Sequence, residues 1–169
     1  AIVFNEALTP GDARRIRDSG MPMVFIDRED ADRALSSVVI DNYAGATLAM
    51  NYLIRQGHRR IGYMHGLQGY DDARRCQAYL DVLRANQLPI DERWLLQGCY
   101  EEAIAYGEAR KLFVNGTPLP DAVFCANDEM AWGVIRALRD SGVRVPETVS
   151  VVGFDDVPRA AHFTPALTT

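Results

Sequence analysis

Seven short apolar runs alternate along the chain with segments whose apolar residues recur at helical spacing. Buried parallel strands are near-continuous in Val, Ile, Leu and Phe, and the runs have this character. The stripe at Ala46, Met50 and Leu53 fits a helix that covers one face of a sheet. Strands and helices in alternation predict an α/β fold with parallel pairing. The predicted strands span residues 1–4, 23–26, 37–40, 60–64, 94–99, 122–126 and 149–154.

Residues typical of helix ends flank the predicted helices. Asp and Asn side chains accept hydrogen bonds from the free N–H groups of a first helical turn, and Gly tolerates left-handed backbone after the last turn. We expect Asp128 to cap the helix that follows the sixth strand. The other predicted caps are Asp41 or Asn42 and Asp71 or Asp72 at helix starts, and Gly57 and Gly142 at helix ends.

Most of the predicted strands end in a polar side chain. The clearest case is residues 149–156, where an apolar strand ends in two carboxylates. In open α/β sheets the ligand binds beyond the carboxyl ends of the strands. The pattern therefore predicts a ligand site at one edge of the sheet. The polar residues at strand ends are Asn5, Asp27, Asp41, Asn42, His65, Asn127, Asp128 and Asp155.

The composition is that of a soluble globular protein. The 169 residues are 48% hydrophobic, and no stretch approaches the roughly 20 apolar residues of a membrane span. Two similar halves favour two small lobes. The net charge of -5 argues against nucleic-acid binding by this piece, because phosphate contacts need clustered Lys and Arg. Three cysteines without a Cys-x-x-Cys pair favour a reducing compartment, and Cys125 is expected to be a buried hydrophobe.

No motif for catalysis or cofactor binding stands out. The chain has no G-x-G-x-x-G, no phosphate-binding G-x-x-x-x-G-K-[ST] and no G-x-S-x-G. His58, His65 and His162 lack the spacing of a zinc site. We therefore expect a protein that is not an enzyme, with no catalytic residue, no cofactor and no metal.

Four residues are suited to bind a polyhydroxylated or heterocyclic molecule. Asp155 can accept two hydrogen bonds, Asn127 can donate and accept, and Arg75 has a planar fork of donors. Tyr100 can lie flat against a sugar or a base. Three of them have a structural alternative, Arg75 as an exposed helix residue, Tyr100 as a half-buried core ring and Asn127 as the helix cap in place of Asp128. The weaker candidates, as effector-binding or hinge residues, are Asp27 and Asp41.

Longer segments resemble the effector-binding region of LacI/GalR-type transcriptional regulators, whose two-lobed fold is shared with periplasmic sugar-binding proteins. The most distinctive are QGHRRIGYMHG and the run from RVPETVSVVGFDD to PALTT, and matching segments cover nearly the whole chain. Ala78 is a departure, because the family usually has Gly there. The resemblance implies that the effector contacts Arg75, Tyr100, Asn127 and Asp155.

The resemblance also implies an architecture and a function. The expected type I periplasmic-binding-protein-like fold has an incomplete N-terminal lobe in residues 1–57, a C-terminal lobe in 58–160 and the start of a crossover in 161–169. Such regulators are cytoplasmic homodimers that bind operator DNA through a helix-turn-helix headpiece, and no headpiece precedes Ala1 here. The expected function is allosteric control of a repressor by a sugar or polyol, with a nucleoside or purine as a second ligand class. The alternative function is a sugar-binding protein of an ABC transport system. No contact with a membrane is expected.

Overall fold

The strands of the protein form two separate parallel sheets, which confirms the predicted α/β class. Each of the seven strands overlaps one of the predicted apolar runs. Asn5, one of the predicted strand-end residues, lies outside the described part of the chain. The computed structural model describes residues 1–4, 10–27, 36–114, 116 and 118–169.

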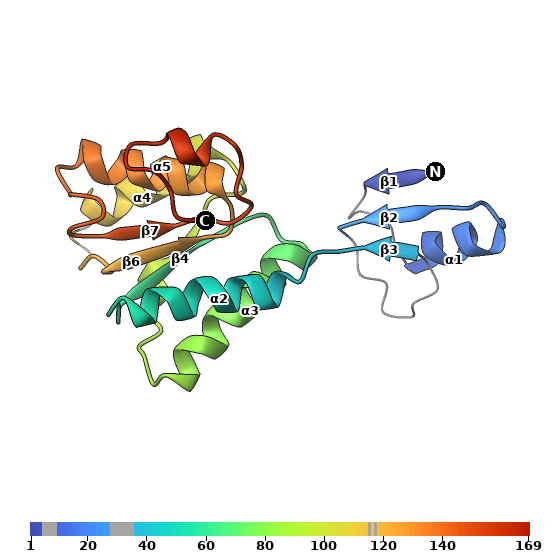
Figure 1. The fold of residues 1–169 in the computed structure, drawn as a ribbon, viewed down its shortest axis with the longest axis horizontal. Helices are drawn as coiled ribbons and strands as arrows, with labels where there is room; N and C mark the ends of the chain where they lie inside the picture. The colour runs from blue at the N-terminus through green and yellow to red at the C-terminus, as the bar shows by residue number, and fades with distance from the viewer. Residues whose placement is uncertain (5–9, 28–35, 115, 117) are drawn as a thin grey trace.

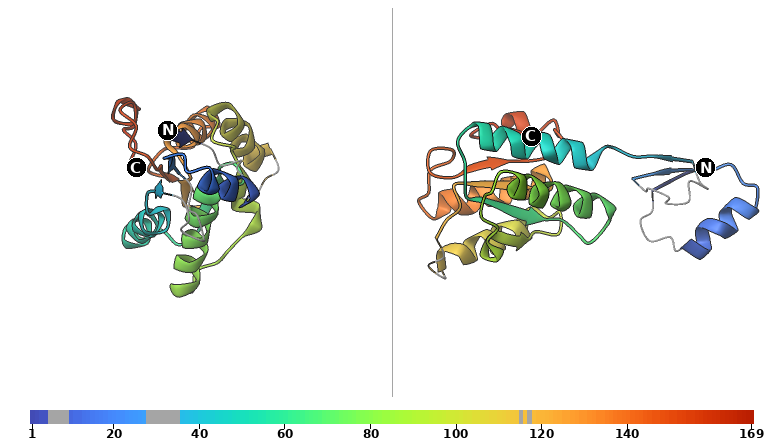
Figure 2. Two further views of the ribbon diagram at one scale, coloured as in Figure 1. Left: turned by 90° about the vertical axis from the view of Figure 1, so that its right-hand side faces the viewer. Right: turned by 90° about the horizontal axis from the view of Figure 1, so that it is seen from below.

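The first sheet is small and lies at one end of the molecule (Figures 1 and 2). Its strand order is β1-β2-β3, and Phe25 at its centre is fully buried. The elements of this unit are β1 (Ile2–Phe4), α1 (Pro10–Asp18), β2 (Val24–Ile26) and β3 (Ser36–Val38).

The second sheet is larger and has helices on both faces, with α2 and α3 on one side and α4 and α5 on the other (Figure 1). Its strand order is β5-β4-β6-β7. None of the helices in the described part of the chain combines the length and the apolarity that a membrane span requires. The strands are β4 (Ile61–His65), β5 (Leu95–Gln97), β6 (Ala122–Cys125) and β7 (Ser150–Val152). The helices are α2 (Asn42–Arg55), α3 (Tyr70–Ala85), α4 (Glu102–Val114) and α5 (Asp128–Asp140), with short 3-10 turns η1 (Glu92–Trp94) and η2 (Ala160–His162).

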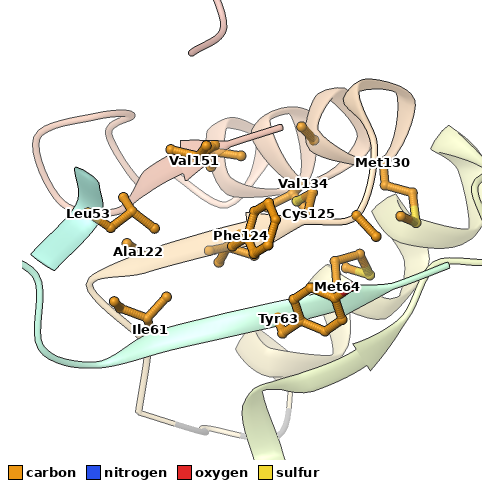
Figure 3. Packing of buried hydrophobic residues seen from close by; sticks show 14 of the residues in the cluster. Leu53, Ile61, Tyr63, Met64, Ala122, Phe124, Cys125, Met130, Val134 and Val151 are labelled. Carbon is orange, nitrogen blue, oxygen red and sulfur yellow. The ribbon is translucent and has the colours of Figure 1, made fainter. Parts of the chain in front are cut away.

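The hydrophobic core lies between these layers. Tyr63 of β4 and Phe124 of β6 are fully buried at its centre, next to Leu53 and Val134 from opposite helix layers (Figure 3). Cys125 is also fully buried, as predicted, and burial raises the pKa of its thiol. Because both faces of the sheet are covered, its strands are apolar on both sides.

Helix α2 packs with the second sheet, which differs from the predicted lobe boundary at residue 57. Its apolar stripe, Ala46, Met50 and Leu53, joins the core of the second sheet, and α2 contacts α3 along its length. The chain therefore passes between the two units at residues 39–41, directly after β3. The stripe showed that the helix covers a sheet, but periodicity carries no information on which sheet it covers.

The residues that cap the helices agree with the predicted caps only in part. Asp41 accepts from the Ala44 N–H at 2.9 Å and caps α2. Asn127, and not Asp128, caps α5, because its side chain accepts from the Met130 N–H. The prediction for α3 was wrong, since Gly69 is at its cap position and Asp71 and Asp72 lie inside the first turn. Gly57 and Gly142 have the left-handed backbone predicted for the residue after a helix.

The last ten residues fold back along the second sheet. Thr168 forms an isolated parallel bridge with Val152, and the Gly153 N–H donates to the Thr168 carbonyl at 2.9 Å. Phe163 stacks on Trp132 of α5 with 4.4 Å between ring centroids. That residues 161–169 begin a crossover to the first lobe stays a prediction.

Replacement of Phe124 by Ala removes a ring that is fully buried between both helix layers. We expect Phe124→Ala to lower the free energy of unfolding by about 3–5 kcal/mol, measured by urea denaturation. Leu48→Ala is the control, because Leu48 is 68% exposed on α2 and its loss should change stability by less than about 0.5 kcal/mol. Equal effects of the two changes would contradict the placement of the core.

Candidate effector-binding site

Arg75 is buried on the second turn of α3 and is bonded on several sides. The residue is only 4% exposed. The Nε group donates to Asn42 Oδ1 at 2.8 Å, and Nη1 donates to the carbonyl of Ala126 at the end of β6. Nη1 also lies 3.7 Å from Asp155 Oδ1. A buried charge is tolerated only when it is paired and hydrogen-bonded, and these contacts meet that condition. The alternative prediction of an exposed helix residue is therefore wrong.

Phe154 forms the apolar side of the Arg75 environment. The Arg75 guanidinium carbon lies 3.8 Å from the centroid of the Phe154 ring, within the range of a cation–π contact. The far side of the ring meets α2 at Gly45, where an added Cβ would lie 2.9 Å from the ring. The ring therefore fills the space between α2 and the guanidinium.

Asp155 follows β7 in a loop that Asp128 holds in place. Asp155 has a φ of 113°, in the region that favours glycine. The fully buried Asp128 accepts from the Val157 N–H at 2.9 Å. The loop also passes so close that a Cβ on Gly153 would lie 2.1 Å from Asp128 Oδ1. Asp128 thus anchors the loop that carries Asp155 and does not cap α5.

Burial raises the pKa of Asp155 to about 6. Arg75 opposes this rise, whereas the carboxylates of Asp128, Asp71 and Asp27 add to it. The Asp155 side chain still has 39% of its surface exposed, so a ligand can reach it. Asp27 follows β2 of the first sheet, with a φ of 57°. Its carboxylate adds to the rise in the pKa of Asp155 and of Asp71.

Tyr100 lies in the turn after β5, with its ring directly over Gly66. An added Cβ on Gly66 would lie 2.1 Å from the Tyr100 Cζ atom, so only glycine accommodates the ring. Cys99 and Tyr100 both have positive φ, at 55° and 62°. Tyr100 is half-buried and packs against the core of the second sheet, in agreement with the structural alternative.

A buried network next to Tyr100 joins the end of β4 to α3. Asp72 accepts from the Tyr63 hydroxyl at 2.9 Å and from the Gly66 N–H at 2.8 Å, and His65 Nδ1 lies 2.9 Å from it. Burial opposes ionisation, but these hydrogen bonds together hold the pKa of Asp72 below its usual value. His65, predicted only as a strand-end residue, therefore helps to fix the turn on which the Tyr100 ring rests.

The side-chain oxygen atoms of Asn127 and Asp41 accept hydrogen bonds from backbone N–H groups at helix starts. The Asn127 Oδ1 atom accepts from Met130, so the side-chain N–H groups are its means of contacting a ligand. Asn127 directly follows Ala126, whose carbonyl binds Arg75. Asp41 is exposed and caps α2 at the end of the connector between the sheets. Of the two weaker candidates, Asp27 acts on Asp155 only through its charge, and Asp41 caps α2; an effector-binding or hinge role for either stays a prediction.

Two residues of the cluster were not predicted as site residues. Asn42 was predicted as a strand-end residue or a helix cap and Asp71 only as a helix cap, yet Asn42 bonds both Arg75 and Asp71. Asp71 had a local signal, because it precedes Arg75 by four residues and so shares its helix face. Asn42 had the signal of a polar residue after a strand, but its pairing with Arg75 had no local signal, since Arg75 lies 33 residues further along the chain.

Arg75 and Asp155 are in direct contact, and together with Asn127 and Tyr100, which also follow strands of this sheet, they suit the recognition of hydroxyl and ring N–H groups. Carboxylate oxygens at Asp155 accept, the Arg75 guanidinium and the Asn127 amide donate, and the Tyr100 ring offers a flat apolar face. Within the described ranges, His, Cys, Asp and Glu side chains form no group of three that could hold a metal ion. Two α/β units joined by a short connector, with a polar edge between them, define a periplasmic-binding-protein-like effector domain.

The comparison with known families agrees with this class. Residues 50–169 match the family described as "Periplasmic binding protein-like domain", and the chain belongs to that family. It is 40% identical over 151 residues to the HTH-type transcriptional repressor PurR of Photorhabdus laumondii, covering 88% of this chain and 44% of that protein. It is 33% identical over 155 residues to the probable HTH-type transcriptional repressor ExuR of Bacillus subtilis, covering 91% of this chain and 46% of that protein.

Solved structures of LacI-type regulators have the same fold. A sugar-binding transcriptional regulator of the LacI family from Escherichia coli, in complex with phosphate, matches with a TM-score of 0.89 and 27% identity, over 98% of this chain and 60% of that chain. The transcriptional regulator CelR in complex with cellobiose matches with a TM-score of 0.87 and 33% identity, over 98% of this chain and 51% of that chain. These homologues are LacI-type transcriptional regulators and not enzymes, and the chain spans less than half the length of the curated relatives.

The ionisation of Asp155 can be measured by carbon NMR of its carboxyl group, with an expected pKa of about 6. The folded state then holds this proton more tightly than the unfolded chain does, so the contribution of Asp155 to stability falls as the pH rises from about 4 to about 6. Asp128→Asn keeps an acceptor for Val157 and removes a charge, so the pKa of Asp155 should fall. Asp18→Asn on exposed α1 is the control, and equal titration of Asp155 in both variants would refute the assigned electrostatics.

Proposed function

We propose that this chain is the effector-binding part of a LacI-type transcriptional repressor, and that a sugar or related polyol is its effector. The observation that carries the proposal is the buried Arg75 guanidinium beside the Asp155 carboxyl, at the edge of the second sheet where its strands end. Hydroxyl groups both donate and accept, so a polyol can bond to this guanidinium and this carboxylate at once.

Each proposed site residue has a role that its geometry supports. Arg75 donates to ligand oxygens, Asp155 accepts from ligand hydroxyls, and the Asn127 amide donates. The Tyr100 ring stacks on the apolar face of the ligand. Asp27, from the other unit, completes the set when the two units close on the ligand.

The proposed mechanism is closure of the cleft between the two units. A ligand shifts the equilibrium between open and closed forms only by the difference in its affinity for them. In the whole protein, a homodimer would read operator DNA through paired helix-turn-helix elements, whose separation depends on the angle between the units. A coupling of about 1–3 kcal/mol changes operator affinity roughly 5- to 150-fold. Effector and operator binding in the cytoplasm need no catalytic group and no cofactor.

Two other ligand and function classes were considered. The curated relatives and solved structures reported above are transcriptional regulators, which supports a repressor over a sugar-binding protein of an ABC transport system. A nucleoside or purine is the second candidate for the effector, because Tyr100 can stack on a base and Asp155 can accept from ring N–H groups.

A ligand panel tests the proposal directly. We expect d-glucose, d-ribose or cellobiose to stabilise the chain, and adenine and adenosine to have no effect, in a thermal denaturation assay. A ligand at 100 times its dissociation constant stabilises by about 2.7 kcal/mol, which raises Tm by roughly 5–10 °C for a chain of this size. Stabilisation by adenine or adenosine alone would favour the second candidate, and no stabilisation by any of the five would contradict both.

Site variants test the residue roles with a ligand that stabilises the wild-type chain. Hydrogen bonds to charged groups contribute about 1.5–3 kcal/mol, so Arg75→Ala or Asp155→Asn should each weaken binding at least about tenfold in isothermal titration calorimetry. Arg84→Ala is the matched control, because Arg84 is 59% exposed on the same helix and should leave affinity unchanged. Unchanged affinity in both site variants would remove Arg75 and Asp155 from the site.

A further inference from the structure

Asn42 lies where the connector between the two units meets the second sheet. It is the first residue of α2, and its backbone N–H donates to the Ile40 carbonyl in the connector at 2.9 Å. Its side chain is buried, with 2% exposure. Asp41 supplies the helix cap, so the Asn42 amide is not needed for that purpose.

Both ends of the Asn42 amide are bonded to charged groups on α3. Its Oδ1 atom accepts from Arg75 Nε at 2.8 Å, and its Nδ2 group donates to Asp71 Oδ1 at 2.8 Å. A guanidinium can only donate and an ionised carboxylate can only accept, so an amide is the group that satisfies both. Leucine has a similar shape but would leave both charged groups without this partner.

Asp71 is the natural competitor for the Arg75 guanidinium. The two residues are four apart on one helix face, a spacing at which opposite charges attract. Burial raises the pKa of Asp71, while Arg75 and the Asn42 hydrogen bond both lower it. With Asn42 between them, the Asp71 carboxylate accepts a hydrogen bond from the Asn42 amide. The Arg75 guanidinium points to the Ala126 carbonyl and Asp155.

We propose that Asn42 is a positioning residue that keeps Arg75 directed at Asp155 by separating it from Asp71, and so links the connector to the effector site. The backbone of Asn42 moves with the connector, and its side chain moves with Arg75. A change in the angle between the units therefore moves the Arg75 guanidinium. In the reverse direction, a ligand that hydrogen-bonds to Arg75 changes the position of the connector through Asn42. The link between the connector and effector binding rests on the proposed function, whereas the positioning of Arg75 does not.

The test without ligand is a double-mutant cycle on Asn42 and Asp71, read out by the carboxyl NMR titration of Asp155. Asn42→Leu should let Arg75 turn to Asp71, and the pKa of Asp155 should rise by roughly 0.5 or more because Arg75 no longer lowers it. In the Asp71→Asn background the competitor is gone, so Asn42→Leu should leave the Asp155 titration unchanged. The groups that act on Asp155 are Arg75, Asp128, Asp71 and Asp27.

Thr47→Val is the matched control, because Thr47 also lies on α2 and its hydroxyl donates to the Tyr43 carbonyl, away from Arg75 and Asp71. It should not move the Asp155 titration. Should Asn42→Leu fail to fold, Asn42→Ala removes the same two hydrogen bonds and has the same expected result. An unchanged Asp155 titration in Asn42→Leu, or an equal rise in both Asp71 backgrounds, would overturn the positioning role.

A second arm measures the affinity for d-glucose by calorimetry in the wild type, Asn42→Leu and Thr47→Val. We expect Asn42→Leu to weaken binding at least about tenfold and Thr47→Val to leave it unchanged. If the wild type binds none of d-glucose, d-ribose and cellobiose but the NMR cycle gives the expected result, the sugar assignment fails and the positioning role stands. If d-glucose binds the wild type and Asn42→Leu equally, the link from Asn42 to the effector site is overturned.

Discussion

The buried guanidinium of Arg75 is the constraint on which the arrangement of the site depends. A positive charge with 4% exposure requires partners on every side, and here they come from three different elements. Asn42 at the start of α2, the Ala126 carbonyl after β6 and the Asp155 carboxyl after β7 are held together by this one group. Helix α2 is thereby tied to the edge of the second sheet, although it directly follows the connector from the first.

The backbone at this edge is held in conformations that ordinary residues seldom adopt. Such conformations cost of the order of 1–3 kcal/mol each, and surrounding contacts must maintain them. The Gly98–Tyr100 turn is maintained by the close fit of the Tyr100 ring over Gly66, and the Asp155 loop by the bond from Val157 to Asp128. The described non-glycine residues with positive φ at strand ends are Asp27, Cys99, Tyr100, Asp155 and Asp156. Strain is therefore concentrated where the proposed effector binds.

The two-unit architecture gives these residues a functional context. The chain belongs to the periplasmic-binding-protein-like family, and its relatives include LacI-type repressors. In the proposed mechanism the effector binds between the two units, so its affinity depends on their relative angle, and the short connector at residues 39–41 is the proposed hinge. The charged groups proposed to contact the ligand are Asp27 of the first unit and Arg75 with Asp155 of the second.

The sequence by itself determined the strands, the parallel α/β class, the polar edge and most of the candidate residues. These features are local, because apolar runs, helical stripes and the residue that ends a strand can be read within a short window. The tertiary structure alone decided that α2 belongs to the second sheet, that Asp128 anchors a loop, and that Asn42 separates Arg75 from Asp71. The roles of Asp128 and Asn42 depend on contacts between residues 29 or more positions apart, and no local pattern encodes which distant partner a buried polar group will meet.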